Sequence, residues 1–82
     1  MALYFFDTRD DETFIEDDVG REFPDLVSVQ REASKSLAEL AEDVIPGALK
    51  RTLKVEVRDV FGPVLMAFLI FEAVILRPVA EA

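Results

Sequence analysis

The chain has 82 residues, no cysteine, no histidine and a net charge of −8 at pH 7. This length suits one small domain, in which roughly 40% of the unfolded surface stays exposed after folding. The missing thiols exclude disulfides and thiolate metal sites, and the acidity argues against binding to nucleic acid or to anionic membranes.

The first predicted strand is the aromatic run at residues 2–6, which has strong strand character. This apolar run is too short for the core of a signal peptide, so we expect a cytoplasmic protein. Short strands are predicted at residues 13–16 and 21–23. Between them, Asp17 and Gly20 have the spacing of a type I turn.

Acidic side chains are concentrated at residues 7–25, where nine carboxylates accompany two arginines. The simplest interpretation is an acidic rim that keeps the domain in solution. Two alternatives are a docking surface for a basic protein partner and a weak calcium or magnesium site. The spacing lacks the pattern of an EF-hand, so we expect no metal and no cofactor. The candidate residues are Asp7, Asp10, Asp11, Glu12, Asp17 and Asp18.

One amphipathic helix is predicted from Leu26 to about residue 45, because apolar residues recur there at steps of three and four. Asp25 is placed to accept hydrogen bonds from the free amides of the first turn. Pro46 and Gly47 end the helix, since proline disfavours helical geometry before it and glycine accepts the left-handed conformation that follows many helices.

Two strands are predicted after the helix. Residues 52–58 alternate, with Leu53, Val55 and Val57 on one face. After an aspartate-to-glycine turn at 59–62, residues 64–76 are apolar except for Glu72. As a helix, thirteen residues would reach roughly 20 Å, whereas a bilayer core needs about 30 Å, so a membrane span is excluded. We predict a strand at 64–70 with a bend near residue 71 or 72.

This last strand is apolar on both faces, and a single helix covers only one face of the sheet. We expect large apolar side chains in the row that points to the uncovered face. Each of them would lose roughly 1.5–3 kcal/mol of burial free energy if it stayed in water. The sequence therefore predicts a homodimer; the alternative is that the tail at residues 73–79 folds back over the row. The predicted interface residues are Leu65, Ala67, Leu69 and Phe71.

No catalytic constellation is present in the sequence. The chain has neither histidine nor cysteine, and Ser28, Ser34 and Ser36 lie on the predicted helix without a neighbouring base. We therefore expect no enzymatic activity. The predicted function is a protein-interaction module that self-associates through its C-terminal apolar strand.

Three stretches of the chain resemble a known family: Tyr4-Phe5-Phe6, DDVGREFPDL at residues 17–26 and DVFGPVL at residues 59–65. They are similar to short bacterial domains of unknown function, abundant in rhizobia and related alphaproteobacteria. The resemblance implies a small cytoplasmic α+β domain without an established activity. Where that family often has a histidine, this chain has Asp7, so no role of that histidine carries over.

The predicted elements together indicate an α+β fold of the order β-β-α-β-β. A small antiparallel sheet is expected to carry one amphipathic helix on one face, in a single domain at residues 1–82. The strand order is not determined by the pattern.

Overall fold

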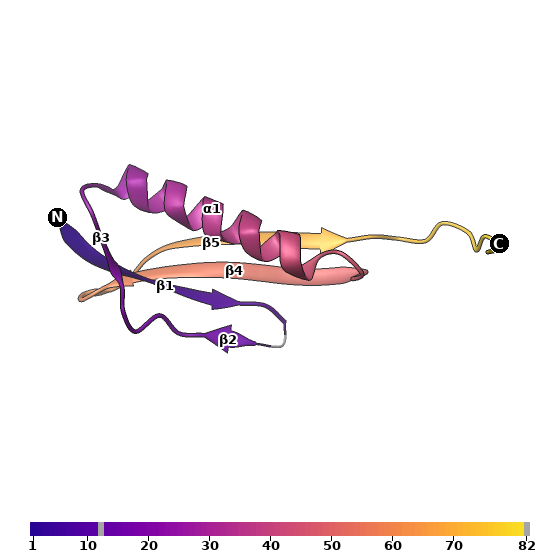
Figure 1. Cartoon of the computed structure of the whole chain (residues 1–82), viewed down its shortest axis with the longest axis horizontal. Coiled ribbons are helices and arrows are strands. Elements are labelled where there is room, and N and C mark those ends of the chain that lie inside the picture. Colours follow the sequence, from indigo (N-terminus) through magenta and orange to yellow (C-terminus); the bar gives the residue numbers. More distant parts are fainter. Residues whose placement is uncertain (12, 82) are drawn as a thin grey trace.

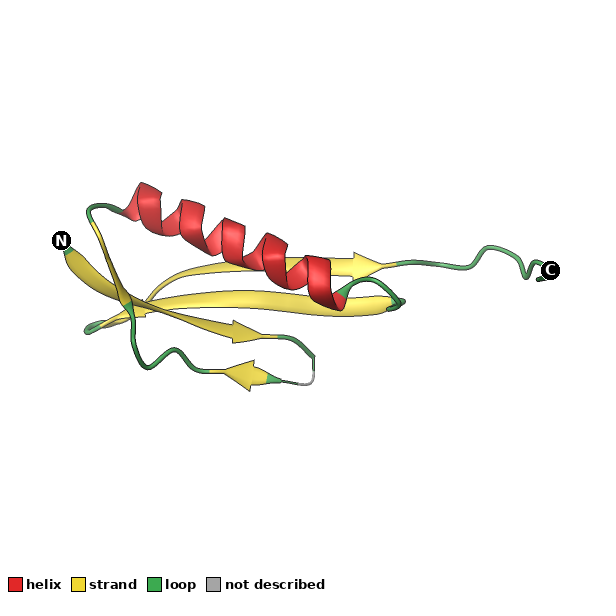
Figure 2. Cartoon of the chain, viewed as in Figure 1, coloured by secondary structure: helices red, strands yellow, loops and turns green. Residues whose placement is uncertain are grey.

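The computed structural model describes residues 1–11 and 13–81 (Figures 1 and 2). One helix lies across one face of an antiparallel sheet, which confirms the predicted α+β class. In chain order the elements are β1 (Ala2–Arg9), β2 (Phe14–Ile15), β3 (Arg21–Phe23), α1 (Leu26–Val44), β4 (Lys50–Asp59) and β5 (Gly62–Glu72).

The sheet has the strand order β2-β1-β4-β5, and β3 also pairs with β1. All of these pairs are antiparallel. The chain therefore places β4 inside the sheet, between β1 and β5, while β5 lies at the edge. α1 crosses β4 and β5 on one face (Figure 1).

The helix has the boundaries and the N-cap that the sequence predicts. The backbone N–H of Ser28 donates to Asp25 Oδ1 at 2.8 Å, which satisfies one of the free amides of the first turn. At the other end the N–H of Ile45 still donates to the carbonyl of Ala41, and Gly47 follows with a φ of 87°. That positive φ suits glycine and turns the chain toward β4.

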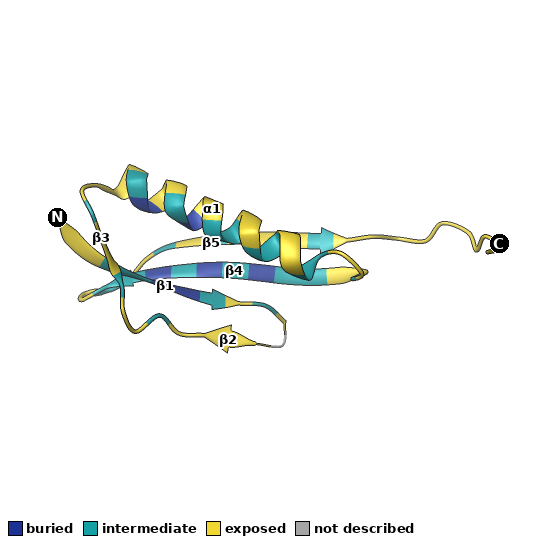
Figure 3. Ribbon diagram, in the orientation of Figure 1, coloured by how far each residue is buried: buried dark blue, intermediate teal, exposed yellow. Residues whose placement is uncertain are grey.

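The core lies between α1 and the facing side of the sheet, where the dark blue segments of Figure 3 meet. Alternate residues of β4 point into it, as the strict alternation in the sequence predicts. Tyr4, Phe23 and Leu37 pack around it at partial burial. The buried apolar residues are Phe6, Val29, Ala33, Leu53, Val55 and Val57.

Three strands are longer than predicted, and β4 runs from Lys50 to Asp59 rather than over residues 52–58. β1 continues to Arg9 because its last residues pair with β4, and tertiary pairing overrides the local turn signal of the acids. β5 continues to Glu72, which pairs with Lys50, so the bend predicted near residue 71 is wrong. The irregularity in this hairpin lies instead between Val57 and Arg58, where the register shifts at a β-bulge.

The C-terminal tail extends away from the domain (Figure 1). Its first residue is held by a hydrogen bond from the N–H of Ala73 to the carbonyl of Leu49 at 2.8 Å. Beyond it Val74, Ile75 and Leu76 are all exposed, and Leu76 is 92% accessible. The alternative that the tail folds back over the last strand is therefore wrong.

Candidate protein-interaction surface

The face of the sheet opposite α1 is not covered by a helix, and it divides into a polar half and an apolar half. We call it the open face. Residues directly opposite each other on paired strands share a face, so the register assigns the side chains. The polar half, on β1 and β4, carries Asp7, Arg9, Lys54, Glu56 and Arg58. The apolar half, on β5, carries Met66, Phe68 and Ile70, here called the open row.

The open row is exposed along its whole length. Met66 is 54%, Phe68 60% and Ile70 64% accessible. The prediction had assigned the uncovered row to Leu65, Ala67, Leu69 and Phe71. Leu65 and Ala67 instead pack against the core under α1, Leu69 lies opposite buried Leu53, and Phe71 is half-buried. The assignment of the two rows is thus reversed, although both rows belong to β5 as expected.

The β-bulge explains the reversal. From the turn at Asp59 and Gly62, a regular hairpin would place Val55 opposite Met66, so that Met66 would face the helix. The bulge leaves Val64 as an extra residue, and Val55 pairs with Ala67. A slip of one residue moves every later side chain of the strand to the other face. Pro63, which pairs with Arg58 beside the bulge, is a local signal, because proline in a strand is confined to edges, first residues and bulges. The alternation alone does not locate the extra residue and therefore misses Met66, Phe68 and Ile70.

The outer edge of β5 is unpaired. Its inner edge pairs with β4 from Gly62 to Glu72, and no strand in the described part of the chain lies on its other side. Natural proteins commonly protect such an edge with lysines, prolines or a covering loop. β5 has Pro63 near its start, Glu72 at its end and no lysine. Most of its length is therefore open to pairing.

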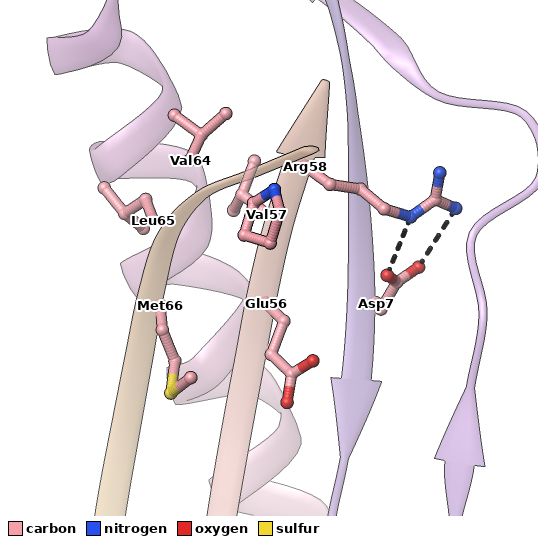
Figure 4. Close-up of a pocket in the computed structure, with 8 residues that line it drawn as sticks. Asp7, Glu56, Val57, Arg58, Val64, Leu65 and Met66 are labelled. Atoms are coloured by element: carbon pink, nitrogen blue, oxygen red, sulfur yellow. Dashed lines mark hydrogen bonds and ion pairs between the residues drawn. The ribbon is translucent and has the colours of Figure 1, made fainter. Parts of the chain in front are cut away.

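The polar half of the open face is organised around Asp7 and Arg58 (Figure 4). Asp7 is only 6% accessible, and Arg58 Nε lies 3.0 Å from its Oδ2. Arg58 Nη2 donates to the carbonyl of Asp17 at 2.8 Å, and its guanidinium lies over the ring of Phe5. The hydrogen bond to Asp7 raises the pKa of Arg58. This cluster of Asp7, Arg58, Phe5 and the Asp17 carbonyl joins β1, β4 and the segment before β3.

Asp17 holds that segment in place. Its carboxylate accepts hydrogen bonds from the backbone N–H groups of Phe6 at 3.0 Å, Val19 at 3.0 Å and Gly20 at 3.1 Å. Partial burial alone would raise the pKa of Asp17, but these donors stabilise the ionised form and bring the pKa below its usual value. Its own N–H donates to Asp7 Oδ1 at 2.9 Å. Both carboxylates therefore have structural roles.

A shallow hollow of about 360 Å³ lies where the polar and apolar halves meet. Asp7, Glu56 and Arg58 line one part of it, and Met66 lines another (Figure 4). Pro63 also lines the hollow. Because Asp7 and Arg58 already bind each other, the hollow presents few unoccupied polar groups. It extends the open row toward the turn rather than forming an enclosed ligand site.

The predicted acidic surface is only partly formed. Asp7 does not belong to it because it is buried, and this part of the prediction is wrong. Asp11 and Asp18 are exposed, and Asp10 is half-buried at the turn after β1. Glu12 lies outside the described residues. Among the residues that the structure describes, no group of three acidic side chains is placed to hold a metal ion.

The whole chain exposes more surface than a compact domain of its mass. The accessible area is 6176 Å², whereas a folded monomer of 9.2 kDa is expected to expose about 4,900 Å². The radius of gyration is 15.9 Å, against about 12 Å for a compact chain of this length. The elongated parts of the structure are the β4–β5 hairpin and the tail, which extends away from the domain (Figure 1).

Comparison with known proteins identifies one family. The model of the "Domain of unknown function (DUF6894)" matches residues 3–70, which span all five strands and the helix up to Ile70. Nothing among the curated proteins or the solved structures matches the chain. Over the described residues, no helix is both long enough and apolar enough to cross a membrane.

Proposed function

Since the chain belongs to the DUF6894 family, whose function is unknown, we propose from its own surface that it is a non-enzymatic protein-interaction module that self-associates through β5. The observation that carries this proposal is the edge position of β5 together with its open row. Apolar side chains on both faces are typical of a strand that is buried on both sides. In β5, which has eleven residues, one edge and one face are instead uncovered.

The energetic argument concerns the open row. Fully burying a large apolar side chain contributes about 1.5–3 kcal/mol, and Met66, Phe68 and Ile70 each remain more than half exposed. Total stabilities of small domains are only about 5–15 kcal/mol. Covering this row would therefore add a large fraction of the stability of a chain of 82 residues.

The charge distribution favours a second copy of the chain as the partner of β5. Residues 60–71 contain no charged side chain, whereas the net charge of −8 is concentrated at residues 7–25. Two β5 strands can therefore meet without bringing their acidic segments together.

Light scattering during gel filtration tests the proposal. We expect the wild-type protein to elute as a dimer at micromolar concentration and to dissociate on dilution. Phe68→Asp should convert the dimer to a monomer. The variant monomer should melt at the same temperature as the wild-type monomer, because Phe68 is 60% exposed and outside the core. Val27→Asp is the matched control, since Val27 is 67% exposed on α1 and lies beside the exposed helix residues Gln30 and Ser34 rather than on β5. A wild-type protein that is monomeric at micromolar concentration would refute self-association.

Docking of a basic protein is the second candidate function. The exposed carboxylates of Asp11, Asp18 and Glu22 support it, because the net negative charge of residues 7–25 favours association with a partner of opposite sign. Such binding should weaken steeply as salt is added, whereas self-association through an apolar strand should not. Measuring affinity in a salt series therefore separates the two candidates.

A further inference from the structure

We propose that the second copy adds its β5 to the free edge of β5 in antiparallel orientation, so that the two sheets continue as one. This inference rests on the proposed self-association and specifies its geometry. It predicts a twofold axis near Ala67, at the middle of the strand, and an apolar strip on the open face that is built from both copies.

The free edge favours strand pairing over other contacts. The outer N–H and C=O groups of β5 have no strand partner in the region that the structure describes, while its inner groups pair with β4 over the full length of the strand. A strand added from another chain satisfies these groups with backbone hydrogen bonds, and alternate side chains on its two faces provide specificity. A second β5 matches the first in length and in its lack of charge.

The alternative of stacking two open faces is disfavoured by the polar half of that face. Stacking would remove water from the Arg58–Asp7 pair and from the Arg9–Glu56 pair, whose atoms lie 3.0 Å and 3.8 Å apart. Desolvating ion pairs costs free energy that their attraction does not always offset. Edge pairing leaves Arg58 and the Arg9–Glu56 pair as exposed as they are in one copy, and it brings apolar side chains together on both faces of β5.

Symmetry restricts the register. Two antiparallel copies of one strand in a common sheet are related by a twofold axis perpendicular to that sheet, so even-numbered residues must lie opposite even-numbered residues. The β-bulge at Val64 breaks the alternation of β5, so this rule holds only over Leu65–Glu72. The axis near Ala67 pairs Leu65–Leu69 of one copy with the same residues of the other. Met66 then lies opposite Phe68 of the partner subunit, and no charged residue lies close to the axis.

The consequence is a surface that one copy does not possess. Met66, Phe68 and Ile70 from both copies lie side by side on the same face, and the row of three becomes a strip of six. On the opposite face, Leu69, which is 38% exposed beside α1, gains an apolar neighbour from the second copy. The pairing thus covers part of both rows with residues that are already in the strand conformation.

Introduced cysteines test the register, because the natural chain has none. Directly opposite residues have Cα atoms about 4.5–5.5 Å apart, which is within the range for a disulfide. We would prepare Met66→Cys and Phe68→Cys separately, mix them, oxidise them and identify the crosslinked pairs by mass. The expected product is a mixed crosslink that joins position 66 of one variant to position 68 of the other. Its yield should be several-fold higher than the yield of crosslinked dimer from either variant alone. The cysteines of a single variant are diagonal neighbours, about 7–8 Å apart.

Ser34→Cys, on the exposed side of α1, measures crosslinking by random collision. If the wild-type protein is dimeric but the mixed crosslink does not exceed this control, edge pairing is wrong and self-association stands. A crosslink that is strongest within one variant refutes the register centred on Ala67. If the protein is monomeric, both the pairing and the proposed function fail.

Discussion

Asp7 and Arg58 form a salt bridge between neighbouring strands, although 51 positions separate them in the chain. Asp7 lies opposite Glu56 in the register, so Arg58 is its diagonal neighbour on the open face. The guanidinium also reaches the carbonyl of Asp17 at 2.8 Å. One arginine thereby connects the central strand of the sheet to β1 and to the segment that leads into β3.

The first prediction concerns this pair. Asp7→Ala should lower the free energy of unfolding by about 1–3 kcal/mol, because the N–H of Asp17 loses its acceptor in a partly buried site. Urea denaturation measures the loss. Glu56→Ala is the control, since its contact with Arg9 is long and half exposed, and pairs of this kind contribute about 0–1 kcal/mol. Equal losses for the two variants would show that the Asp7 cluster has no special structural role.

A second prediction follows from the lowered pKa of Asp17. The folded protein binds a proton at this carboxyl less readily than the unfolded chain does. Its contribution to stability is therefore complete above the ordinary aspartate pKa of about 3.9 and is lost as the pH falls through the lower folded value. Asp17→Asn should destabilise the protein at pH 7, and the gap to wild type should narrow below about pH 4. Urea melts across this range give the difference, and a gap that stays constant with pH would contradict the assignment.

The third prediction concerns Gly20, which has a φ of 75°. A Cβ at this position would lie 2.9 Å from the ring of Phe5, closer than the packing allows. Gly20→Ala therefore combines a steric clash with the cost of about 1–2 kcal/mol for a left-handed conformation. Gly47→Ala carries the conformational cost alone, because its φ is 87° and no atom lies within 4 Å of the added Cβ. Thermal melting should show a larger loss for Gly20→Ala, and equal losses would rule out the clash.

The fourth prediction concerns the tail. Ending the chain at Ala73 should leave the melting temperature nearly unchanged, because the exposed side chains beyond it, among them Ile75 and Leu76, contribute little to the fold. Ending it at Ile70 should lower the melting temperature, since Phe71 and Glu72 pair with Arg51 and Lys50. A large fall in melting temperature when the chain ends at Ala73 would mean that the tail packs against the protein in solution, most directly against the open row.

Several features of the fold are predictable from the sequence because their causes are local. The spacing of apolar residues and the Asp25 cap specify α1, since both act within a few turns of one helix. Strict alternation specifies β4 and identifies Leu53, Val55 and Val57 as its inner face. The apolar run at residues 64–76 likewise predicts a strand with two apolar faces, and one helix is too little to cover both of them.

Other features depend on contacts between segments that are distant along the chain. The β-bulge beside Val57 reverses which row of β5 lies under α1, and so the surface consists of Met66, Phe68 and Ile70 rather than the predicted residues. The pairing of Asp7 with Arg58 changes an expected surface acid into a buried structural group.

What the sequence by itself determined is therefore the α+β class, the ends of the helix and a strand with apolar side chains on both faces. The tertiary structure alone decided the strand order, the register and the partner of each buried charge. The physical reason is that a period of two or 3.6 residues is set by each segment's own backbone geometry. Which face of a strand is covered depends instead on a register that a single extra residue, here Val64, is enough to invert.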